Sequence, residues 1–479
     1  MAKLTKRSED FSKWYLDIIQ MADLADYAPV KGCMVIKPYG YKIWELIQAD
    51  LNIRMEAMGV ENACFPLLIP ESFITKEADH VDGFAPELLT ATRVGQKELE
   101  EPYVIRPTSE TIIYDMYSRW IHSYRDLPMK MNQWANVFRW ELKTKPFLRT
   151  SEFFWQEGHT VHATNEEADE MVMDALNMYD AFQRESMALC GVKGRKSESE
   201  KFPGADYTTT IEAMAQDGKA IQSCTSHNLG QGFSKAFNIE FTDKDEQQKT
   251  PFITSWGMST RIIGTMIMIH SDDSGLRLPP MLAPHQVVVV PITRKNNEES
   301  SKRVMEKARE LTLELKKLGL RVKLDDRDTK SPGFKFAEWE VKGVPIRMEI
   351  GPKDLDDNQV VCARRDLSTK APVAFENIAT EVPGLLESIH NNLYAESEEN
   401  LQKSITDVFD FERFSELVEE KGGFMRVAWC GNDQCEKDIK EKTKASSRCI
   451  PFEGQEAVKG DCFHCGEEAK HITLFAKAY

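Results

Sequence analysis

One segment of this sequence has the residue types that a binding site for an anion and a small cation would need. Residues 137–159 read VFRWELKTKPFLRTSEFFWQEGH, in a chain with a formal net charge of −16. Side chains two positions apart share a face of a β-strand, so a strand over VFRWEL would place Arg139 and Glu141 together, opposite the aromatic residues. In FFWQEGH the same spacing places three residues on one face: Trp155, Glu157 and His159. Two antiparallel strands of this kind could bind an anion beside Arg139 and a cationic or aromatic group between the carboxylates.

A loop with three basic residues separates these two predicted strands: Lys143, Lys145 and Arg149. Such a loop would add positive charge near Arg139, where an anion would bind. A salt-bridged hairpin on a protein surface explains the same spacing. This segment by itself does not decide between the two interpretations.

A second segment, VIRPTSETIIYDMY, has the pattern of a strand that leads into a helix. Thr108 or Ser109 suits the N-cap position, and Glu110 suits the first turn, where the helix dipole favours negative charge. Capping alone would account for all three residues. The segment is therefore a candidate site only in combination with others.

A third segment, ITSWGMSTRIIGTMIMIH, predicts a buried apolar helix with Ser259 as its cap. Arg261 then falls in the first turn, the unfavourable end of the helix dipole for a cation. An arginine there is tolerable if it pairs with an anion, and helix N-termini suit phosphates, although a structural carboxylate would serve equally well. A fourth segment, IQSCTSHNLG, contains a single histidine, His227. A lone histidine is interpreted first as a structural residue.

Four cysteines near the C-terminus have the spacing of a metal site. Cys430 and Cys435 are close in the sequence, as are Cys462 and Cys465. Two such pairs can supply four thiolates to one tetrahedral Zn²⁺, which can organise a small domain that lacks a core of its own. Iron would fit four thiolates too, and five unrelated reduced cysteines are the alternative interpretation. Cys449 lies between the pairs and is expected to take no part.

The elements that must position these residues fall into three predicted domains. Residues 1–282 mix strand-like and helix-like patterns, with a helix predicted up to Gly59 and a strand over NACFPLLIP. Residues 283–382 alternate strands with helices, from PHQVVVVPI through the helical SPGFKFAEWEVKG to VPIRMEI and QVVCARR, which predicts an α/β fold. Residues 383–479 begin with a polar helical linker and contain the cysteine cluster.

The overall composition excludes several classes of protein. A chain of 479 residues has room for two to four domains, and its longest apolar runs are too short to span a bilayer. The N-terminus lacks the pattern of a secretory signal, so we expect a cytoplasmic protein without membrane contact. The acidic net charge argues against non-specific binding of polyanions, so any contact with nucleic acid must be local and selective.

Four segments resemble, in order and spacing, the active-site motifs of prolyl-tRNA synthetases of the archaeal and eukaryotic type, which are class IIa aminoacyl-tRNA synthetases: RPTSE, FRWE followed by LRTSEFFWQEGHT, TSHNLGQ, and SWGMSTR. The resemblance covers essentially the whole chain. It implies an α+β catalytic domain with an antiparallel sheet flanked by helices, then an α/β anticodon-binding domain and a small zinc-binding C-terminal domain. It also implies a homodimer, whose interface in the family is formed by the first motif, here the helix ending at Gly59 and the strand with Pro66.

The resemblance implies roles for individual residues. L-proline would be bound by residues of all four motifs: Thr108, Glu110, Arg139, Trp155, Glu157, His159, His227, Ser255 and Gly257. ATP would be bound by a second set that shares one arginine with the first: Arg139, Glu141, Arg149, Thr150, Gln222, Thr225 and Arg261. Arg139 and Arg261 would be the catalytic residues. Ser151 departs from the family pattern, which has arginine at this position in many members.

The implied reaction is the ligation of proline to tRNA(Pro). The carboxylate of proline attacks the α-phosphorus of ATP and releases pyrophosphate, and the prolyl group then passes to the terminal ribose of the tRNA. Because the nucleophile is already ionised, arginines and Mg²⁺ rather than a general base would drive the first step. A small apolar pocket separates near-isosteres weakly, so misactivation of alanine or cysteine is expected. The span from His159 to Ser255 leaves no obvious room for the editing domain of bacterial-type relatives, so no editing in cis is expected.

The segment FAEWEVKGVPIRMEIGPKDL resembles the anticodon-reading segment of the family, with Glu340 and Arg347 as candidates for contacts to guanines. A solvated helix face and strand is the alternative interpretation. Family members of this type end in tyrosine with the terminal carboxylate directed toward the active site, which makes Tyr479 a candidate for the same role. The rival functions are a catalytically silent relative that acts as a binding module, and a class IIa synthetase for threonine or histidine.

Overall fold

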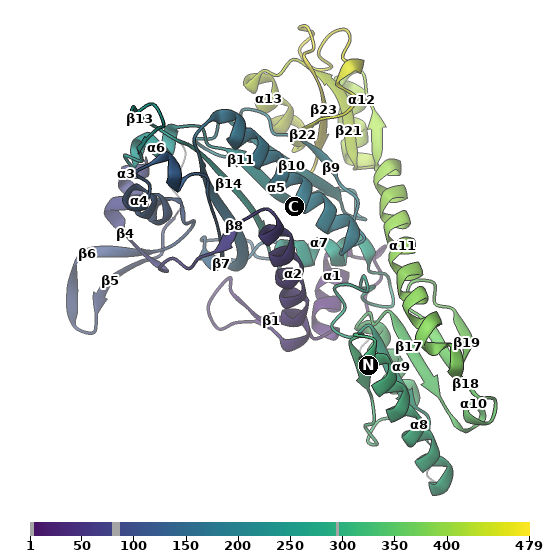
Figure 1. The fold of residues 1–479 in the computed structure, drawn as a ribbon. Coiled ribbons are helices and arrows are strands. Elements are labelled where there is room, and N and C mark those ends of the chain that lie inside the picture. The colour runs from purple at the N-terminus through teal and green to yellow at the C-terminus, as the bar shows by residue number, and fades with distance from the viewer. Residues whose placement is uncertain (1–3, 79–86, 294–296) are drawn as a thin grey trace.

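The structure is a computed structural model that describes residues 4–78, 87–293 and 297–479, and it is built around one long sheet (Figure 1). The sheet has eleven strands in the order β20-β21-β23-β22-β9-β10-β11-β14-β8-β7-β3. The strands of the N-terminal and C-terminal parts of the chain are thus continuous with one another. Among the helices of the described ranges, none has the length and apolar character needed to cross a membrane.

Seven strands from the N-terminal part form one half of the sheet: β3 (Glu61–Asn62), β7 (Met129–Phe138), β8 (Glu152–His162), β9 (Val192–Arg195), β10 (Tyr207–Met214), β11 (Ala220–Asn228) and β14 (Phe252–Ser259). Their pairings are antiparallel except at the edge, where β3 runs parallel to β7. The antiparallel catalytic sheet that the resemblance implied is therefore confirmed.

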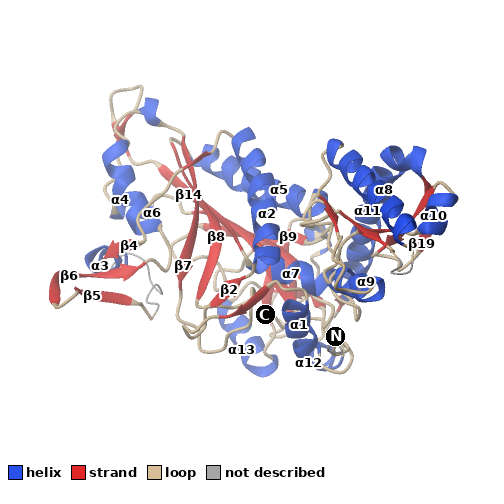
Figure 2. Cartoon of the chain, turned by 90° about the horizontal axis from the view of Figure 1, so that it is seen from below, coloured by secondary structure: helices blue, strands red, loops and turns tan. Residues whose placement is uncertain are grey.

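Helices cover this half of the sheet: α1 (Phe11–Met21), α2 (Pro38–Ala57), α4 (Glu110–Trp120), α5 (Asn165–Glu185), α6 (Gly232–Ala236) and α7 (Arg261–His270). The helices α1, α2, α5 and α7 share one apolar core with strands β10, β11 and β14, whereas α4 and α6 share another (Figures 1 and 2). Helix α2 ends one residue before its C-cap Met58, and Gly59 follows with φ +74°, a conformation that glycine adopts readily. The helix predicted to end at Gly59 is confirmed.

Strands β7 and β8 form the predicted hairpin, with Phe138 paired to Glu152 at the end next to the connecting loop. The prediction that VFRWEL is a strand throughout is wrong, because β7 ends at Phe138 and the next residues belong to the connection. The next ladder contact runs from the backbone N–H of Arg139 to the carbonyl of Ser151 at 2.7 Å, and an isolated bridge between Lys145 and Arg149 lies further along the loop. Arg139 is therefore the last residue held by the sheet, and Glu141 lies in the loop beyond it.

The strand predicted over NACFPLLIP is also wrong, because only its flanks are paired, in β3 and in β4 (Leu68–Pro70). Between them, side chains satisfy the backbone. The N–H of Phe65 donates to the side chain of Gln133 at 2.6 Å, and its carbonyl accepts from Arg106 at 3.0 Å. Strand β4 instead joins a small separate sheet with β6 (Lys97–Ile105) and β5 (Thr90–Val94), beside α3 (Glu71–Ala78). Two short hairpins, β1–β2 (Ala25–Tyr27 and Met34–Ile36) and β12–β13 (Phe241–Thr242 and Gln248–Lys249), lie outside both sheets.

The middle part of the chain folds into a five-stranded mixed sheet with helices, as predicted. Its strands, in spatial order, are β16 (Val322–Leu324), β15 (Val287–Pro291), β17 (Ile346–Ile350), β18 (Gln359–Arg364) and β19 (Lys370–Ala374). The helices of this α/β unit are α8 (Glu298–Lys317), α9 (Pro332–Val341) and α10 (Pro352–Asp356). Helix α9 begins with Pro332 after the N-cap Ser331, whose side chain accepts a hydrogen bond from the backbone of Phe334, which agrees with the predicted helix start.

A helix of 27 residues, α11 (Ile378–Ser404), runs from the α/β unit to the C-terminal unit (Figure 1). The C-terminal unit contains α12 (Phe411–Glu420), α13 (Asp433–Thr443) and the strands β20 (Ile405–Asp407), β21 (Phe424–Trp429), β22 (Ser446–Pro451) and β23 (His471–Ala476). Strand β22 pairs with β9, so this unit extends the catalytic sheet.

Candidate active site

A cavity of about 330 Å³ opens where β8, β14 and β11 lie side by side. Its walls also include the start of α4 and residues that follow β9. All the residues predicted to bind proline line it: Thr108, Glu110, Arg139, Trp155, Glu157, His159, His227, Ser255 and Gly257. The strand register explains this grouping, since Ser255 of β14 pairs with His159 of β8 on one side and with His227 of β11 on the other.

Glu157 is a buried carboxylate in the wall of this cavity. It accepts hydrogen bonds from Ser109 Oγ at 2.6 Å and Gln133 Nε2 at 2.8 Å, and its Oε2 lies 3.0 Å from His159 Nε2. Burial alone would raise the pKa of Glu157, but the pairing with His159 and these hydrogen bonds bring it below its ordinary value. Burial would lower the pKa of His159, and the pairing with Glu157 brings it above its ordinary value. The two groups therefore favour a buried ion pair.

The start of α4 contributes a second carboxylate to the cavity. Ser109 occupies the N-cap position of this helix, but its hydroxyl donates to Glu157 and makes no capping hydrogen bond. Thr108 donates its hydroxyl to the carboxylate of Glu110. Capping therefore does not explain these three residues, because their side chains belong to the polar lining of the cavity.

Arg139 lies at the boundary between this cavity and a smaller hollow, and it lines both. Its guanidinium carbon lies 5.5 and 5.3 Å from the ring centroids of Phe153 and Trp155, and its Nε donates to the carbonyl of Pro107 at 2.8 Å. Burial lowers its pKa, and within the described ranges no carboxylate forms an ion pair with it. The buried Nε1–H of Trp155 also has no partner in the described part of the chain. The wall thus presents donors that the protein itself does not use.

The smaller hollow has a volume of about 70 Å³. Three predicted ATP-binding residues from the connection between β7 and β8 border it: Glu141, Arg149 and Thr150. The Nε of Arg149 lies 3.3 Å from a carboxylate oxygen of Glu141, and Thr150 donates its hydroxyl to the carbonyl of Glu152 at 2.7 Å. Arg139 and Arg261 border the hollow from the other side, so three arginines surround it.

Ser151, the departure from the family pattern, has a packing reason. Its side chain is buried, and its Oγ accepts a hydrogen bond from the backbone N–H of Glu141 at 3.3 Å. Its own N–H donates to the carbonyl of Gly32 at 2.8 Å. A Cβ atom on Gly32 would lie only 2.2 Å from Ser151 Oγ, so this close approach needs small residues on both sides.

Arg261 is the first residue of α7 and lines both the cavity and the smaller hollow. The N-cap is Thr260 rather than the predicted Ser259, although Ser259 Oγ accepts from the N–H of Arg261 at 3.3 Å. Its Nε donates to the carbonyl of Leu148 at 3.2 Å, and it has no ion pair with a carboxylate of the described residues. Burial and the proximity of Arg139 lower its pKa. The absence of a carboxylate partner favours the anion-binding interpretation over the structural one.

Strand β11 contributes the far wall of the cavity through Gln222, Thr225 and His227. His227 Nδ1 lies 2.8 Å from the hydroxyl of Thr208, and its ring centroid is 4.8 Å from that of Phe202. Burial lowers the pKa of His227 to about 3. The imidazole is therefore neutral near pH 7 and acts as a hydrogen-bonding group rather than a charge.

Residues around the connection between β9 and β10 complete the cavity and were not predicted: Lys196, Glu200, Lys201, Phe202 and Pro203. Their sequence, KSESEKFPG, has the composition of an ordinary solvated loop. Lys196 is nevertheless buried, with Nζ 2.7 Å from Glu212 Oε1 and 2.8 Å from the carbonyl of Arg448. Proline and glycine in a charged segment were the only sequence signal of a defined loop here.

The C-terminal residue Tyr479 lies beside the first residue of β11. Its N–H donates to the carbonyl of Ala220 at 3.1 Å, and its hydroxyl donates to Asp217 at 2.6 Å. The ammonium groups of Lys145 and Lys219 lie 4.9 and 4.8 Å from its ring centroid. The end of the chain is therefore fixed to the strand that carries Gln222.

A third hollow, of about 190 Å³, lies in the α/β unit. It contains both residues predicted to read the anticodon, Glu340 and Arg347, together with Arg364, Arg365 and Lys370. All four cations of this hollow pair with carboxylates: Arg347 and Lys370 with Glu349, Arg364 with Asp366, and Arg365 with Asp272. A role of this hollow in binding the anticodon stays a prediction.

The four predicted metal ligands, Cys430, Cys435, Cys462 and Cys465, come together with their sulfur atoms within 4.8 Å of one another. The Cys435–Cys462 and Cys430–Cys465 sulfur distances are 3.8 and 3.6 Å. Zn–S bonds of about 2.3 Å in a tetrahedron would place the sulfurs about 3.8 Å apart, so the donor set fits Zn²⁺. Cys449 belongs to a different apolar cluster, as expected.

Known families match all three parts of the chain. The tRNA synthetase class II core domain (G, H, P, S and T) matches residues 92–270, the anticodon binding domain matches 286–385, and the prolyl-tRNA synthetase C-terminal domain matches 411–479. Over 477 residues the chain is 50% identical to proline–tRNA ligase 2 of Clostridioides difficile (strain 630), covering 100% of this chain and 98% of that protein. The chain belongs to the prolyl-tRNA synthetase family.

Other members of the prolyl-tRNA synthetase family also match over nearly the whole chain. The proline–tRNA ligase of Roseiflexus castenholzii is 53% identical over 481 residues, with 99% of each chain covered. A crystal structure of the prolyl-tRNA synthetase of Cryptosporidium parvum, in complex with halofuginone and AMPPNP, matches with a TM-score of 0.94 at 41% identity over 99% of each chain. The family resemblance and the three-part fold predicted from the sequence are confirmed, whereas the archaeal and eukaryotic type stays a prediction.

Proposed function

We infer that this chain is a proline–tRNA ligase, which activates L-proline with ATP and transfers the prolyl group to tRNA(Pro). The observation that carries this function is the position of Arg139 between a cavity with two buried carboxylates and a hollow bordered by three arginines. The carboxylate of a substrate bound in the cavity would lie at Arg139, next to a phosphate bound in the hollow. Because like charges must approach in this reaction, such a junction of cations is what the chemistry requires.

We assign the larger cavity to proline. Its secondary ammonium group would lie near Glu110 and Thr108, and Glu157 would be held ionised by His159 behind it. The ring of proline would pack against Trp155, with His227, Ser255 and Gly257 as further walls. A neutral His227 adds no positive charge that would repel the ammonium group.

We assign the smaller hollow and the adjoining wall to ATP. Arg139 and Arg261 would act as the catalytic residues by neutralising the α-phosphate as the proline carboxylate attacks it, with the bond to the departing pyrophosphate breaking in the same step. Glu141, Arg149 and Thr150 would hold the nucleotide from the loop side, and two residues of β11 would hold it from the sheet: Gln222 and Thr225. The Mg²⁺ that accompanies ATP is part of the substrate and would share the neutralisation.

The second step transfers the prolyl group to tRNA. A hydroxyl of the terminal ribose attacks the carbonyl of prolyl-adenylate, and AMP leaves. Glu340 and Arg347 are the proposed contacts to anticodon bases in the α/β unit. Zn²⁺ on Cys430, Cys435, Cys462 and Cys465 would stabilise the C-terminal unit. The terminal carboxylate of Tyr479 is proposed to face the ATP side.

We also propose that the chain has three domains, residues 1–282, 283–382 and 383–479. We further propose that it is a cytoplasmic homodimer of the archaeal and eukaryotic type. The absence of editing in cis is a proposal too, supported by the span between β8 and β14, which α5, α6 and strands β9 to β13 already occupy. Rapid hydrolysis of alanyl-tRNA(Pro) by the purified protein would contradict it.

The function is tested by exchange of pyrophosphate into ATP with each of the twenty amino acids. Exchange with proline far ahead of alanine and cysteine supports the proposal. Exchange driven by threonine or histidine would identify a different class IIa enzyme, and no exchange at all would favour a catalytically silent binding module.

A further inference from the structure

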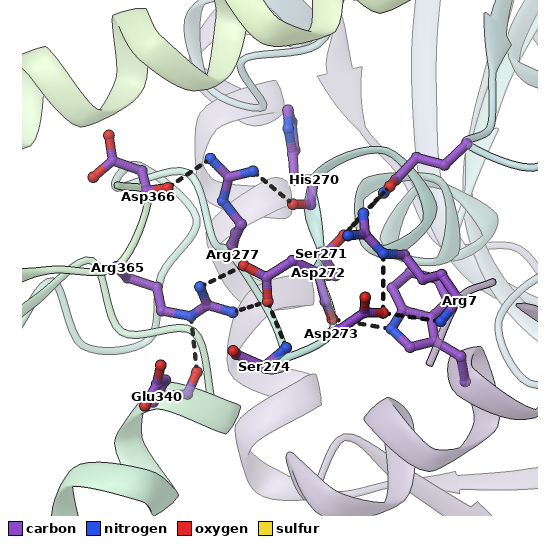
Figure 3. Close-up of polar contacts among 12 residues, drawn as sticks. Arg7, His270, Ser271, Asp272, Asp273, Ser274, Arg277, Glu340, Arg365 and Asp366 are labelled. Atoms are coloured by element: carbon purple, nitrogen blue, oxygen red, sulfur yellow. Dashed lines mark hydrogen bonds and ion pairs between the residues drawn. The ribbon is translucent and has the colours of Figure 1, made fainter. Parts of the chain in front are cut away.

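The loop that follows α7 is joined to the α/β unit by a two-pronged ion pair (Figure 3). Asp272, two residues beyond the end of α7, accepts from both terminal nitrogens of Arg365, at 2.8 and 2.5 Å. Arg365 comes directly after strand β18, so the pair connects two parts of the chain that are distant in the sequence. The Arg365 side chain is 4% exposed and that of Asp272 is 26% exposed, so the pair is buried on the arginine side and partly open to solvent on the carboxylate side.

Arg365 also borders the hollow proposed for the anticodon. Its Nε donates to the carbonyl of Glu340 at 3.0 Å, and its side chain lines that hollow together with Arg347. One guanidinium is therefore bonded on one edge to the backbone of a candidate anticodon-reading residue and on the other edge to the catalytic unit. Among the described residues, no other side chain bonds both to a candidate anticodon-reading residue and to the catalytic unit.

Asp272 is itself held firmly from the catalytic side. The indole N–H of Trp14 donates to its carbonyl at 2.9 Å, and the N–H of Ser274 donates to its carboxylate at 2.8 Å. The next residue, Asp273, accepts from the backbone and the Nε of Arg7 at 2.9 and 3.1 Å. The loop is thus fixed to α1 and to the N-terminal segment. Through Asp272 it therefore fixes the α/β unit relative to the catalytic unit.

The backbones also approach closely at this junction. Leu276 donates its N–H to the carbonyl of Val341 at 2.9 Å. A Cβ atom on Gly275 would lie 2.5 Å from the Cα of Val341, so this contact needs a glycine. Arg277 adds a paired contact to Glu396 of α11 at 2.8 and 3.0 Å. The ion pair is therefore one of several contacts that together fix the angle between the units.

Helix α7 connects this junction to the active site. Arg261 stands at its first position, and Asp272 comes two residues after its last residue, His270. A helix is a stiff element, so the two ends keep a fixed relation to each other. The position of the anticodon hollow is therefore set, through Arg365 and Asp272, against the same helix that carries a proposed catalytic arginine.

We propose that Arg365 and Asp272 form a positioning pair, which holds the anticodon-binding unit at the spacing and angle at which a tRNA bound there presents its 3′ end to the active site. The pair touches neither proline nor ATP in this role. This inference rests on the proposed function, because it assumes that tRNA(Pro) engages both units at once. Its consequence is selective, since amino-acid activation needs only the catalytic unit whereas tRNA charging needs both.

The test compares two reactions of the same purified variants. Asp272→Asn keeps the shape of the side chain and removes its charge, and Arg365→Lys keeps the charge and removes the two-pronged geometry. The matched control is Asp407→Asn, the same change in a two-pronged pair with Arg426, which lies on the surface of the C-terminal unit and away from this junction. Each variant is assayed for proline-dependent pyrophosphate exchange and for charging of a full-length tRNA(Pro) transcript and of an acceptor-stem minihelix that lacks the anticodon.

For Asp272→Asn and Arg365→Lys we expect kcat/KM with full-length tRNA(Pro) to fall about tenfold or more, as for a misplaced reactant. Pyrophosphate exchange and minihelix charging should stay within about twofold of the unmodified protein. The double variant should charge full-length tRNA(Pro) no more slowly than the more impaired single variant. Asp407→Asn should leave all three reactions unchanged. A parallel fall of exchange and charging, or unchanged charging of full-length tRNA, would overturn the positioning role. Failure of the unmodified protein to exchange pyrophosphate with proline would instead overturn the proposed function.

Discussion

Arg448 of the C-terminal unit donates two hydrogen bonds to the carboxylate of Glu212 in the catalytic sheet, from Nε at 3.1 Å and Nη2 at 3.0 Å. Lys196 donates to the other oxygen of the same carboxylate at 2.7 Å. Glu212 is fully buried, and burial alone would raise its pKa, but the two cations bring it below its ordinary value. The C-terminal unit is therefore attached to the wall of the active site by a buried charge network as well as by strand pairing.

This network predicts that Arg448→Met destabilises the protein strongly. Removing one partner of a buried pair leaves charge without full compensation, which costs about 3 kcal/mol in the free energy of unfolding. The measurement is urea unfolding followed by far-UV circular dichroism. Arg426→Met is the control, since Arg426 pairs with Asp407 on the surface, where the loss should be below about 1 kcal/mol. Equal losses for the two variants would show that the buried network contributes nothing beyond a surface pair.

The Glu157–His159 pair predicts a window of pH in which it stabilises the fold. The pKa of Glu157 is lowered in the folded state, so its contribution is present above the ordinary value of 4.5 and is lost as the pH falls through the lowered pKa. The pKa of His159 is raised, so its contribution is complete below the ordinary value of 6.5 and is lost as the pH rises through the raised pKa. The free energy of unfolding relative to His159→Gln should therefore be greatest between these limits. A pH-independent difference between the two proteins would contradict this.

The cysteine cluster predicts one tightly bound Zn²⁺ per chain. Cys462→Ser should lower the zinc content measured by mass spectrometry of the purified protein, and it should make the C-terminal unit sensitive to proteolysis, because the metal contributes to its folding. Cys64→Ser is the control, since Cys64 is an exposed cysteine outside the cluster. Iron in place of zinc would revise the metal but keep the site, whereas unchanged metal content in Cys462→Ser would refute the site.

Local patterns predicted the parts of the fold that local forces determine. The alternation of Trp155, Glu157 and His159 along β8 placed all three in the cavity, and Pro332 and Gly59 marked the start and the end of their helices. These signals follow from strand and helix periodicity and from backbone preferences, which do not depend on distant residues.

Contacts between distant segments could not be predicted in this way. The pairing of β22 with β9 and the burial of Lys196 depend on a partner about 250 positions away, and no periodicity of the loop that follows β9 records it. The surroundings of the end of β7 also depend on a distant segment, since the N–H of Phe138 donates to the carbonyl of Arg106 and the Nε of Arg139 donates to the carbonyl of Pro107. Ser109 was a plausible cap in sequence, and only its distance to Glu157 shows another use.

Arg261→Lys is predicted to slow activation without weakening proline binding. Arg261 borders the hollow proposed for ATP, and a lysine would keep a charge there but lose the planar, multi-pronged geometry that suits phosphate. Loss of one preorganised donor to developing charge costs about 10²–10³ in kcat, so pyrophosphate exchange should fall by that order while KM for proline changes less than about threefold. Arg119→Lys, in an exposed pair with Asp115 on α4, is the matched control and should behave as the unmodified protein. A rise in KM for proline with an unchanged kcat would instead place Arg261 in amino-acid binding and would remove it from the phosphate side.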